Sequence, residues 1–517
     1  MKRILLFATA INCGLVGNSP VRATLVTHLT IAATGTAAPS GMGNYTSLGS
    51  PVIPQVNSSG QVAFVGSATG GTGIWRHDGT TGTMIARSGA PTPEPTGGNY
   101  LYFDGVRVND AGQVAFWAMT SPGAGIFRSD GTTTVSIARV GGSWPSSLAP
   151  GGGAAYSEVA WDRMAFNSSG QVAYWAALNN GRQGIFLHNG TASATLALHG
   201  TPAPGGGNYI GAFGNVQLNP HGEVAYFATP SGGAGMFLHD GTTGIAIARQ
   251  GMTTPAGGTY TPSFTSFSTQ VNANGQVLYV ASVTGGPSTD GIFLHDGTTG
   301  EAIALRGAAA PGGGAYDVFA ISILYPQLNA AGQVAYWARL TGGPSTDGIF
   351  LHDGTTDAAL ALQGAAAPGT TGTFDSFFGA GTTKGSMLIN NMGLVVLRAA
   401  LALGGDVTAA NDTGFWFGTN ASDLSLLVRE GDSLLVNGAH RTLGQLPLQF
   451  SLSDTGIAWM ASFTDGTQAV MYSQFPLASI PEVGAWAMLL LPAGAAAVVA
   501  GKRRSRRARA RRARAPH

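Results

Sequence analysis

The sequence predicts an all-β fold: an eight-bladed β-propeller of four-stranded antiparallel blades, closed by the N-terminal strand, with one C-terminal transmembrane helix. Three observations support the propeller. A short phrase recurs in seven full copies and one degraded copy, the copies lie 52 to 63 residues apart, and no helical period separates them. Glycine is also frequent, at 79 of 517 residues, as in folds of many short strands joined by tight turns.

The repeated phrase is Asn-x-x-Gly followed by two residues and then, in most copies, by alanine and an aromatic residue. Asn and Gly tolerate positive φ, so the first four residues favour a chain reversal, and the run after them favours a strand. The phrase therefore predicts a β-hairpin in each unit. Its copies begin at Asn57, Asn109, Asn167, Asn219, Asn272, Asn329, Asn390 and, in degraded form, Ser453.

Each unit contains four predicted strands, most clearly in residues 213–251. Strands are expected at 213–218, 223–229, 235–239 and 245–249, with an Asp-Gly turn between the last two. A loop rich in proline and glycine leads to the next unit. This order predicts one antiparallel blade per repeat.

The two ends of the repeat region complement each other. Residues 28–34 match the fourth strand of a unit but follow no first three, and the eighth unit ends near 469–472 without a fourth strand. Pairing of these segments would close a ring and remove open sheet edges. The alternative is two smaller β units with a boundary near residue 370.

The N-terminal segment, residues 1–23, has the features of a secretory signal peptide. Lys2 and Arg3 precede an apolar run, and Ala23 supplies the small residue that signal peptidase requires. The only cysteine, Cys13, lies inside this leader, with a lipoprotein site as the alternative reading. We therefore divide the chain into the leader, a propeller at 24–478 and a C-terminal segment at 479–517.

The sequence of the C-terminal segment indicates a sorting or anchor element. Residues 483–500 carry no charge over 18 positions, just enough to span a bilayer, and residues 501–517 hold nine basic residues and no acidic one. We predict a transmembrane helix at 483–500 with the basic tail in the cytoplasm. The anchor is either temporary, awaiting cleavage, or a permanent single-pass anchor.

Charge is segregated between the body and the ends. Residues 24–500 hold 14 basic and 25 acidic residues, so the body is mildly acidic. A nucleic-acid partner is not expected, because phosphate binding requires a basic surface.

Two resemblances follow from these motifs. The C-terminal segment resembles the PEP-CTERM sorting signal through Ile480, Pro481 and Glu482, the uncharged stretch and the basic end, with Val483 in place of the second proline. This resemblance implies recognition by an exosortase-like enzyme and surface localisation. The body is similar to the tandem-repeat family named for its NxxGxxAF motif, which residues 57–64 and 109–116 match in full. That resemblance implies secretion and brings no catalytic residues.

Five turns that combine histidine with Asp-Gly or Asn-Gly could suggest metal ligands, but each lies in a different unit. We interpret them as hairpin corners, at His77, His188, His239, His295 and His352. We assign no catalytic, cofactor-binding or metal-binding residue.

Ligand candidates are expected where the repeat is broken, because a site needs residues that the other units lack. The third unit and the last two units depart most from the pattern. Paired carboxylates there could serve glycoside chemistry, and Trp161 or Trp144 could stack a sugar. The candidates are Glu158, Trp161, Asp162, Arg163, Asp432 and His440.

The leading functional hypothesis is an exported bacterial surface protein that binds or scaffolds without catalysis, next to extracellular polysaccharide. Its expected partners are signal peptidase, an exosortase-like enzyme, the membrane and exopolysaccharide, and no cofactor is expected. The alternative is a secreted hydrolase or lyase that acts on glycans.

Overall fold

The computed structural model describes residues 26–48, 52–93, 98–141, 147–150, 153–265, 268–319, 326–377 and 387–476. Residues Val26–Phe475 form one compact unit, so two smaller β units are not observed. Met1–Leu25 and Pro476–His517 form the other unit, of which only Pro476 is described. The predicted leader, the sorting motif at Ile480, Pro481 and Glu482, and the basic tail lie outside the described residues.

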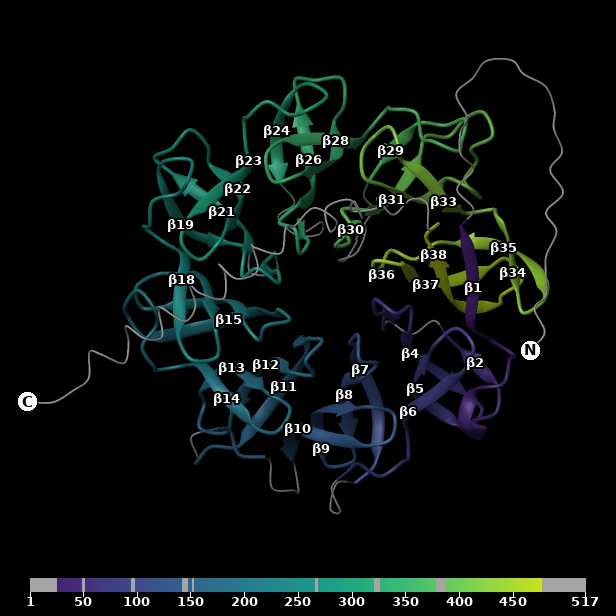
Figure 1. The fold of residues 1–517 in the computed structure, drawn as a ribbon, viewed down its shortest axis with the longest axis horizontal. Coiled ribbons are helices and arrows are strands. Elements are labelled where there is room, and N and C mark those ends of the chain that lie inside the picture. The colour runs from purple at the N-terminus through teal and green to yellow at the C-terminus, as the bar shows by residue number, and fades with distance from the viewer. Residues whose placement is uncertain are drawn as a thin grey trace, which may run out of the picture. The chain divides into compact units, whose positions relative to one another are not determined.

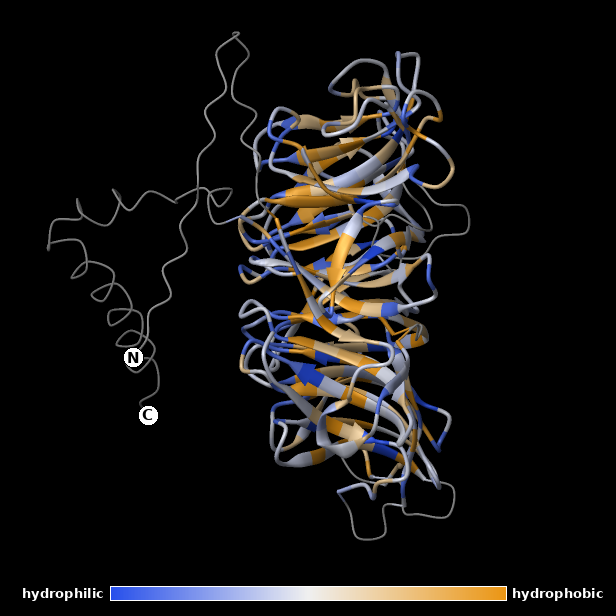
Figure 2. Cartoon of the chain, turned by 90° about the vertical axis from the view of Figure 1, so that its right-hand side faces the viewer, coloured by the Kyte–Doolittle hydropathy of each residue, from blue (hydrophilic) through white to orange (hydrophobic). Residues whose placement is uncertain are grey.

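The unit Val26–Phe475 is a ring of eight antiparallel sheets, which confirms the predicted propeller (Figure 1). The blades are numbered here from first to eighth in chain order. In Figure 1, β7, β15 and β30 lie on the inner side of their blades. Hydrophobic residues concentrate in the strands, whereas the turns at the strand ends are mostly hydrophilic (Figure 2).

Three blades, the second to the fourth, are sheets of four continuous strands. The second contains β7 (Tyr100–Val108), β8 (Val114–Thr120), β9 (Gly123–Ser129) and β10 (Thr134–Gly141). The third contains β11 (Tyr156–Phe166), β12 (Val172–Leu178), β13 (Gln183–His188) and β14 (Ser193–Leu198). The fourth contains β15 (Tyr209–Leu218), β16 (Val224–Pro230), β17 (Gly235–His239) and β18 (Gly244–Arg249), close to the predicted strands.

Four further blades have a first strand in two pieces, both paired with the second strand. The first blade contains β2 (Tyr45–Ser47), β3 (Gln55–Val56), β4 (Val62–Ala68), β5 (Gly71–His77) and β6 (Gly82–Arg87). The fifth contains β19 (Thr259–Phe264), β20 (Gln270–Val271), β21 (Val277–Thr284), β22 (Asp290–His295) and β23 (Gly300–Leu305). The sixth contains β24 (Ala315–Phe319), β25 (Gln327–Leu328), β26 (Val334–Thr341), β27 (Asp347–His352) and β28 (Asp357–Leu362). The seventh contains β29 (Phe374–Ser376), β30 (Met387–Ile389), β31 (Val395–Leu401), β32 (Thr413–Gly418) and β33 (Ser425–Arg429).

The eighth blade joins the two ends of the unit. It contains β34 (Ser433–Val436), β35 (Ala439–Gln445), β36 (Phe450–Leu452), β37 (Gly456–Phe463), β38 (Gln468–Gln474) and the N-terminal strand β1 (Thr27–Ala33). β1 pairs antiparallel with β38, from Thr27 opposite Gln474 to Ala33 opposite Ala469. The predicted ring closure is confirmed, because β1 supplies the fourth strand that the last unit lacks.

The fold prediction was wrong in its last part, the transmembrane helix at 483–500. Within the described residues, no helix is long and apolar enough to cross a membrane. The helical element among these residues is the three-residue 3-10 turn Pro39–Gly41. Residues 483–500 themselves lie outside those ranges. The prediction rested on an uncharged stretch followed by a basic tail. The stretch is of minimal length and contains Pro492, a residue that removes a helix hydrogen bond.

The core is divided into eight clusters, each shared by two neighbouring blades, including the eighth and the first. The strand after the repeated turn explains this division, because its side chains alternate between two interfaces. In β16, Val224 and Tyr226 pack with the third blade, whereas Ala225 packs with the fifth. The small alanine at this position, which six of the eight blades have, therefore leaves room for the large side chains of the next blade.

Each of the first six blades places three aromatic residues in its interface with the preceding blade. The rings on the second and third strands stack at 5.5–5.9 Å between centroids, as Tyr226 does on Phe237. A tyrosine on the first strand meets them at an angle, and in four blades its hydroxyl bonds a second tyrosine at 2.7–2.9 Å, as in Tyr209–Tyr226. These groups make the first six blades similar structural blocks.

Candidate functional site

The turn between the first and second strands of each blade is built around the asparagine of the repeated phrase. In the fourth blade, Asn219 Oδ1 accepts hydrogen bonds from the backbone N–H groups of His221 and Glu223, at 3.0 and 2.9 Å. Gly222 has a φ of +90°, which a residue with a side chain rarely adopts. The phrase therefore fixes the turn through one buried amide and one glycine.

The same asparagines link each blade to the next. The Nδ2 group of each one donates to the backbone carbonyl of the corresponding residue in the following blade, at 2.9–3.3 Å, from Asn57 to Asn109 and onward to Ser453. The eighth blade has Ser453 at this position, which has no side-chain amide. At its junction with the first blade, Thr455 Oγ1 instead donates to the Ser58 carbonyl at 3.4 Å. We call these contacts the asparagine belt.

The residue four positions after the asparagine also bonds to the asparagine belt. In six blades a Gln or Glu at this position accepts a second hydrogen bond from the same Nδ2 group, at 2.6–3.0 Å. Its side chain also lies against the turn glycine of the next blade, where a Cβ atom would stand within 2.7–3.0 Å of a side-chain oxygen. The phrase is thus a structural element that sets the blade-to-blade contact.

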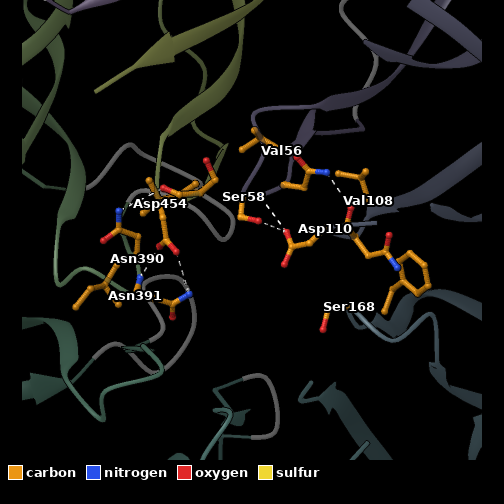
Figure 3. Close-up of a pocket in the computed structure, with 14 residues that line it drawn as sticks. Val56, Ser58, Val108, Asp110, Ser168, Asn390, Asn391 and Asp454 are labelled. Atoms are coloured by element: carbon orange, nitrogen blue, oxygen red, sulfur yellow. Dashed lines mark hydrogen bonds between the residues drawn. The ribbon is translucent and has the colours of Figure 1, made fainter. Parts of the chain in front are cut away.

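The turns of five blades surround a polar cavity of 270 Å³ at the ring axis (Figure 3). It is lined by Val56, Asn57, Ser58, Val108, Asn109, Asp110, Phe166, Ser168, Ile389, Asn390, Asn391, Leu452, Ser453 and Asp454. These residues come from the seventh, eighth, first, second and third blades. We call this space the axial cavity.

The residue directly after each belt asparagine supplies the polar groups of the axial cavity. Asp110 Oδ1 accepts hydrogen bonds from the backbone N and the Oγ of Ser58, at 2.9 and 2.6 Å. Asp454 Oδ1 accepts one from the backbone N of Asn391 at 2.9 Å. The corresponding residues of the fourth to sixth blades, Pro220, Ala273 and Ala330, are not polar. The axis therefore has one polar side that carries two carboxylates.

The histidine turns are hairpin corners, as predicted, and connect the third and fourth strands. His77, His188, His239 and His295 each accept a hydrogen bond at Nδ1 from the N–H of the turn glycine, at 2.9–3.1 Å. In the same turns Asp78, Asp240 and Asp296 accept bonds from two following threonines, which lowers the pKa of each carboxyl group. Among the described residues no group of three or more acidic, His or Cys side chains could hold a metal ion.

Burial lowers the pKa of four of these histidines, His77, His188, His239 and His295. A neutral ring suits their role, because a protonated Nδ1 could not accept the bond from glycine. His352 differs: its Nδ1 lies 3.2 Å from Asp357 Oδ1, and this contact raises its pKa.

Three candidates of the third blade, Trp161, Asp162 and Arg163, lie in a bulge of β11, where pairing with β12 is interrupted between Val159 and Met164. Glu158 precedes the bulge and pairs with Ala177. Glu158, Trp161 and Asp162 are exposed. Arg163 instead donates to the Phe213 carbonyl at 3.1 Å and stacks over Trp175 at 5.0 Å. Arg163 therefore joins the third blade to the fourth.

The candidates of the eighth blade lie elsewhere. Asp432 accepts a hydrogen bond from the backbone N of Arg429 at 2.7 Å, and burial raises its pKa. His440 lies on β35, exposed, with Nδ1 3.3 Å from Ser433 Oγ. The third and eighth blades are not neighbours in the ring, so the fold does not bring the two candidate groups together.

Sequence reasoning missed Asp110, Asn391 and Asp454 in the axial cavity. A signal was present: the position after the belt asparagine varies between units, whereas the asparagine is kept in seven units and the turn glycine in all eight. A variable position inside a constant turn is where repeated blades can differ in chemistry.

Comparisons with known proteins indicate a family but no activity. The profile of a family described as a family of unknown function (DUF7453) matches residues 22–236 and again 229–487. No curated protein is similar in sequence.

Solved structures with some likeness include the β-propeller domain of the trilobed protease from Pyrococcus furiosus, at 8% identity over 72% of this chain and 95% of that one, with a TM-score of 0.35. The Dos1 propeller is 9% identical over 86% and 95%, with a TM-score of 0.41. A puromycin-hydrolyzing peptidase from Mycobacterium tuberculosis is 13% identical over 85% and 62%, with a TM-score of 0.37. Likeness at this level carries no argument about function.

Proposed function

The chain belongs to this family of unknown function, and we propose from its own geometry that it is an exported binding protein that holds hydroxyl-rich saccharide chains without catalysis. The observation that carries the proposal is the polar side of the axial cavity. Ser58, Asp110 and Asn391 line it from the turns of the first, second and seventh blades. Hydroxyl, carboxylate and amide groups together accept and donate the hydrogen bonds that sugar hydroxyl groups require.

The belt asparagines support a binding role over a catalytic one. Asn57, Asn109 and Asn390 line the cavity, but their amide groups already bond the neighbouring turns. They hold the wall in place and leave the residues next to them to face a ligand. A preformed wall of this kind favours binding, since less conformational freedom is lost when the ligand arrives.

Charge favours a neutral ligand over an anionic one. Residues 24–500 carry 14 basic and 25 acidic residues, and Asp110 and Asp454 both line the cavity. An anionic polysaccharide would be repelled by this surface, whereas neutral hydroxyl groups can donate to the two carboxylates.

The proposed place of action is the bacterial cell surface. Support comes from the leader at 1–23 and from the sorting motif at Pro481 and Glu482, which point to signal peptidase and an exosortase-like enzyme as processing partners. Exopolysaccharide is then the abundant hydroxyl-rich polymer within reach.

The test is a glycan array with the purified full chain, followed by titration calorimetry with the strongest neutral glycan. We expect the isosteric double variant Asp110→Asn/Asp454→Asn to lower affinity about tenfold, because charged acceptors form the stronger hydrogen bonds. Asp130→Asn is the matched control, since the third blade already has Asn189 at that place. Unchanged binding by the double variant would contradict the proposal, and so would release of a cleaved product.

A further inference from the structure

Two large aromatic side chains are exposed on the first strands of neighbouring blades. Trp161 in β11 is 48% exposed and Tyr102 in β7 is 43% exposed. By contrast, Trp75, Trp416 and Trp459 are fully buried in blade interfaces. Exposed aromatic side chains on rigid strands leave apolar surface in water, which makes them candidates for ligand contact.

The bulge that carries Trp161 is fixed from both sides. On the side of the second blade, Trp117 Nε1 donates to the Val159 carbonyl at 3.0 Å. On the side of the fourth blade, Arg163 is held by the Phe213 carbonyl and by the ring of Trp175. Trp161 is therefore presented by an anchored segment of backbone.

The two bulges approach each other closely. Gly105 in β7 has a φ of +57°, and a Cβ atom there would lie 2.8 Å from the carbonyl oxygen of Trp161. Only glycine allows the strands to come this near. β7 is itself bulged between Asp104 and Arg107, so two irregular segments meet where the regular blades would have straight strands.

Carboxylates accompany both aromatic residues. The Tyr102 hydroxyl donates to Asp104 Oδ2 at 3.3 Å. Asp162 is exposed in the same bulge as Trp161, and Glu158 is exposed just before the bulge, where it pairs with Ala177. Aromatic faces with carboxylate acceptors beside them suit a sugar ring, whose C–H face can stack while its hydroxyl groups donate.

We propose that the bulges of β7 and β11 form a second saccharide subsite, with Trp161 and Tyr102 as the stacking residues and Asp104, Glu158 and Asp162 as hydroxyl acceptors. None of these residues lines the axial cavity. The ligand is a neutral oligosaccharide, because three carboxylates disfavour an anionic one. The ligand class rests on the proposed function, but the site stands on its own residues.

The experiment titrates the purified full chain with cellohexaose, laminarihexaose and mannohexaose, by calorimetry and by tryptophan fluorescence. We expect at least one of them to bind, Trp161→Ala to weaken binding about tenfold or more, and Trp161→Phe to keep most of the affinity. The control is Leu403→Ala, which removes an even more exposed apolar side chain, in the seventh blade. Thermal unfolding of each variant checks that the ring remains folded.

Any of four results would overturn the subsite, three with the chain or its Trp161 variant and one with the variant of the axial cavity. The first is that none of the three sugars binds, and the second is that Trp161→Ala binds like the parent chain. The third is that tetramethylammonium binds in place of the sugars, which would indicate cation recognition by the same aromatic residues. If the Asp110→Asn/Asp454→Asn variant alone loses binding, the axial cavity remains as the site and the subsite fails.

Discussion

Replacement of Asn219 by alanine tests whether the asparagine belt holds the blades together. The side chain is 1% exposed and makes four hydrogen bonds. Nδ2 donates to Glu223 Oε2 at 2.6 Å and to the Asn272 carbonyl at 2.9 Å, and Oδ1 accepts from the N–H groups of His221 and Glu223. The variant removes all four and leaves a cavity at the junction of two blades.

The expected cost follows from the groups that lose a partner. Two backbone N–H groups remain in place without a partner, and the Asn272 carbonyl loses one of its two, since it still accepts from Gly275 N at 3.0 Å. The neighbouring His221 is exposed, so water reaches part of the turn and the low end of the usual range applies. At about 1 kcal/mol for each group, Asn219→Ala should lower the free energy of unfolding by about 3 kcal/mol.

A second pair of variants separates the belt contact from the turn. Asn219→Asp keeps the acceptor but loses both donors and places a carboxylate beside Glu223, so it should be destabilising as well. Adding Glu223→Gln supplies an amide donor to that carboxylate and should recover about 1 kcal/mol or more, measured as a double-mutant cycle.

Urea unfolding followed by tryptophan fluorescence measures these differences as midpoint shifts. Asn274→Ala is the control, because it removes an exposed hydrogen bond to the next blade, from Asn274 Nδ2 to the Ala330 carbonyl at 2.8 Å. The belt would have no role in stability if Asn219→Ala cost no more than this control, or if the double variant were no more stable than Asn219→Asp.

Two further outcomes follow from the turns. Burial lowers the pKa of His77, His239 and His295 below the ordinary 6.5, so their contribution to stability is full above pH 6.5 and is lost as the pH falls below it. Serine at these places, as at Ser129, should flatten the pH dependence of the urea midpoint, and an unchanged slope would refute this cause. Gly222→Ala should cost about 1 kcal/mol more than Gly241→Ala, because both have positive φ but only the first would contact Gln171, at 2.8 Å. Equal midpoints for the two variants would show that this contact between blades is not tight.

The fold was predictable because each step of it is encoded locally. Asparagine and glycine specify the turn, and alternating large and small residues in the following strand specify the two interfaces of a blade. The closing strand could be predicted for the same reason, since residues 28–34 carry the pattern of a fourth strand. The transmembrane helix could not be predicted in this way, because the absence of charge in 483–500 does not by itself determine whether a helix forms.

The candidate site was harder to predict because it joins residues far apart in the chain. Asp110 and Asp454 line one cavity only because the ring brings the second and eighth blades to the same axis. Trp161 was found in advance, since the bulge breaks the repeat. Tyr102 was not predicted as a ligand candidate, because the sequence of its strand does not break the repeat. Its exposure depends on the adjacent blade.

The way the ring closes has a mechanical consequence. Thr27 lies opposite Gln474 in the β1–β38 pair, so the chain enters and leaves the propeller at the same end of one antiparallel ladder. A force that pulls Val26 away from Phe475 would therefore act in unzipping geometry. It would break the hydrogen bonds between β1 and β38 one after another, whereas a shear force would load them all at once. The seam between the eighth and first blades also lacks the asparagine bond that joins the other blades. Tension between Val26 and Phe475 should therefore open the ring first at the β1–β38 ladder and the adjacent seam, at a low force, while the remaining blades stay stacked.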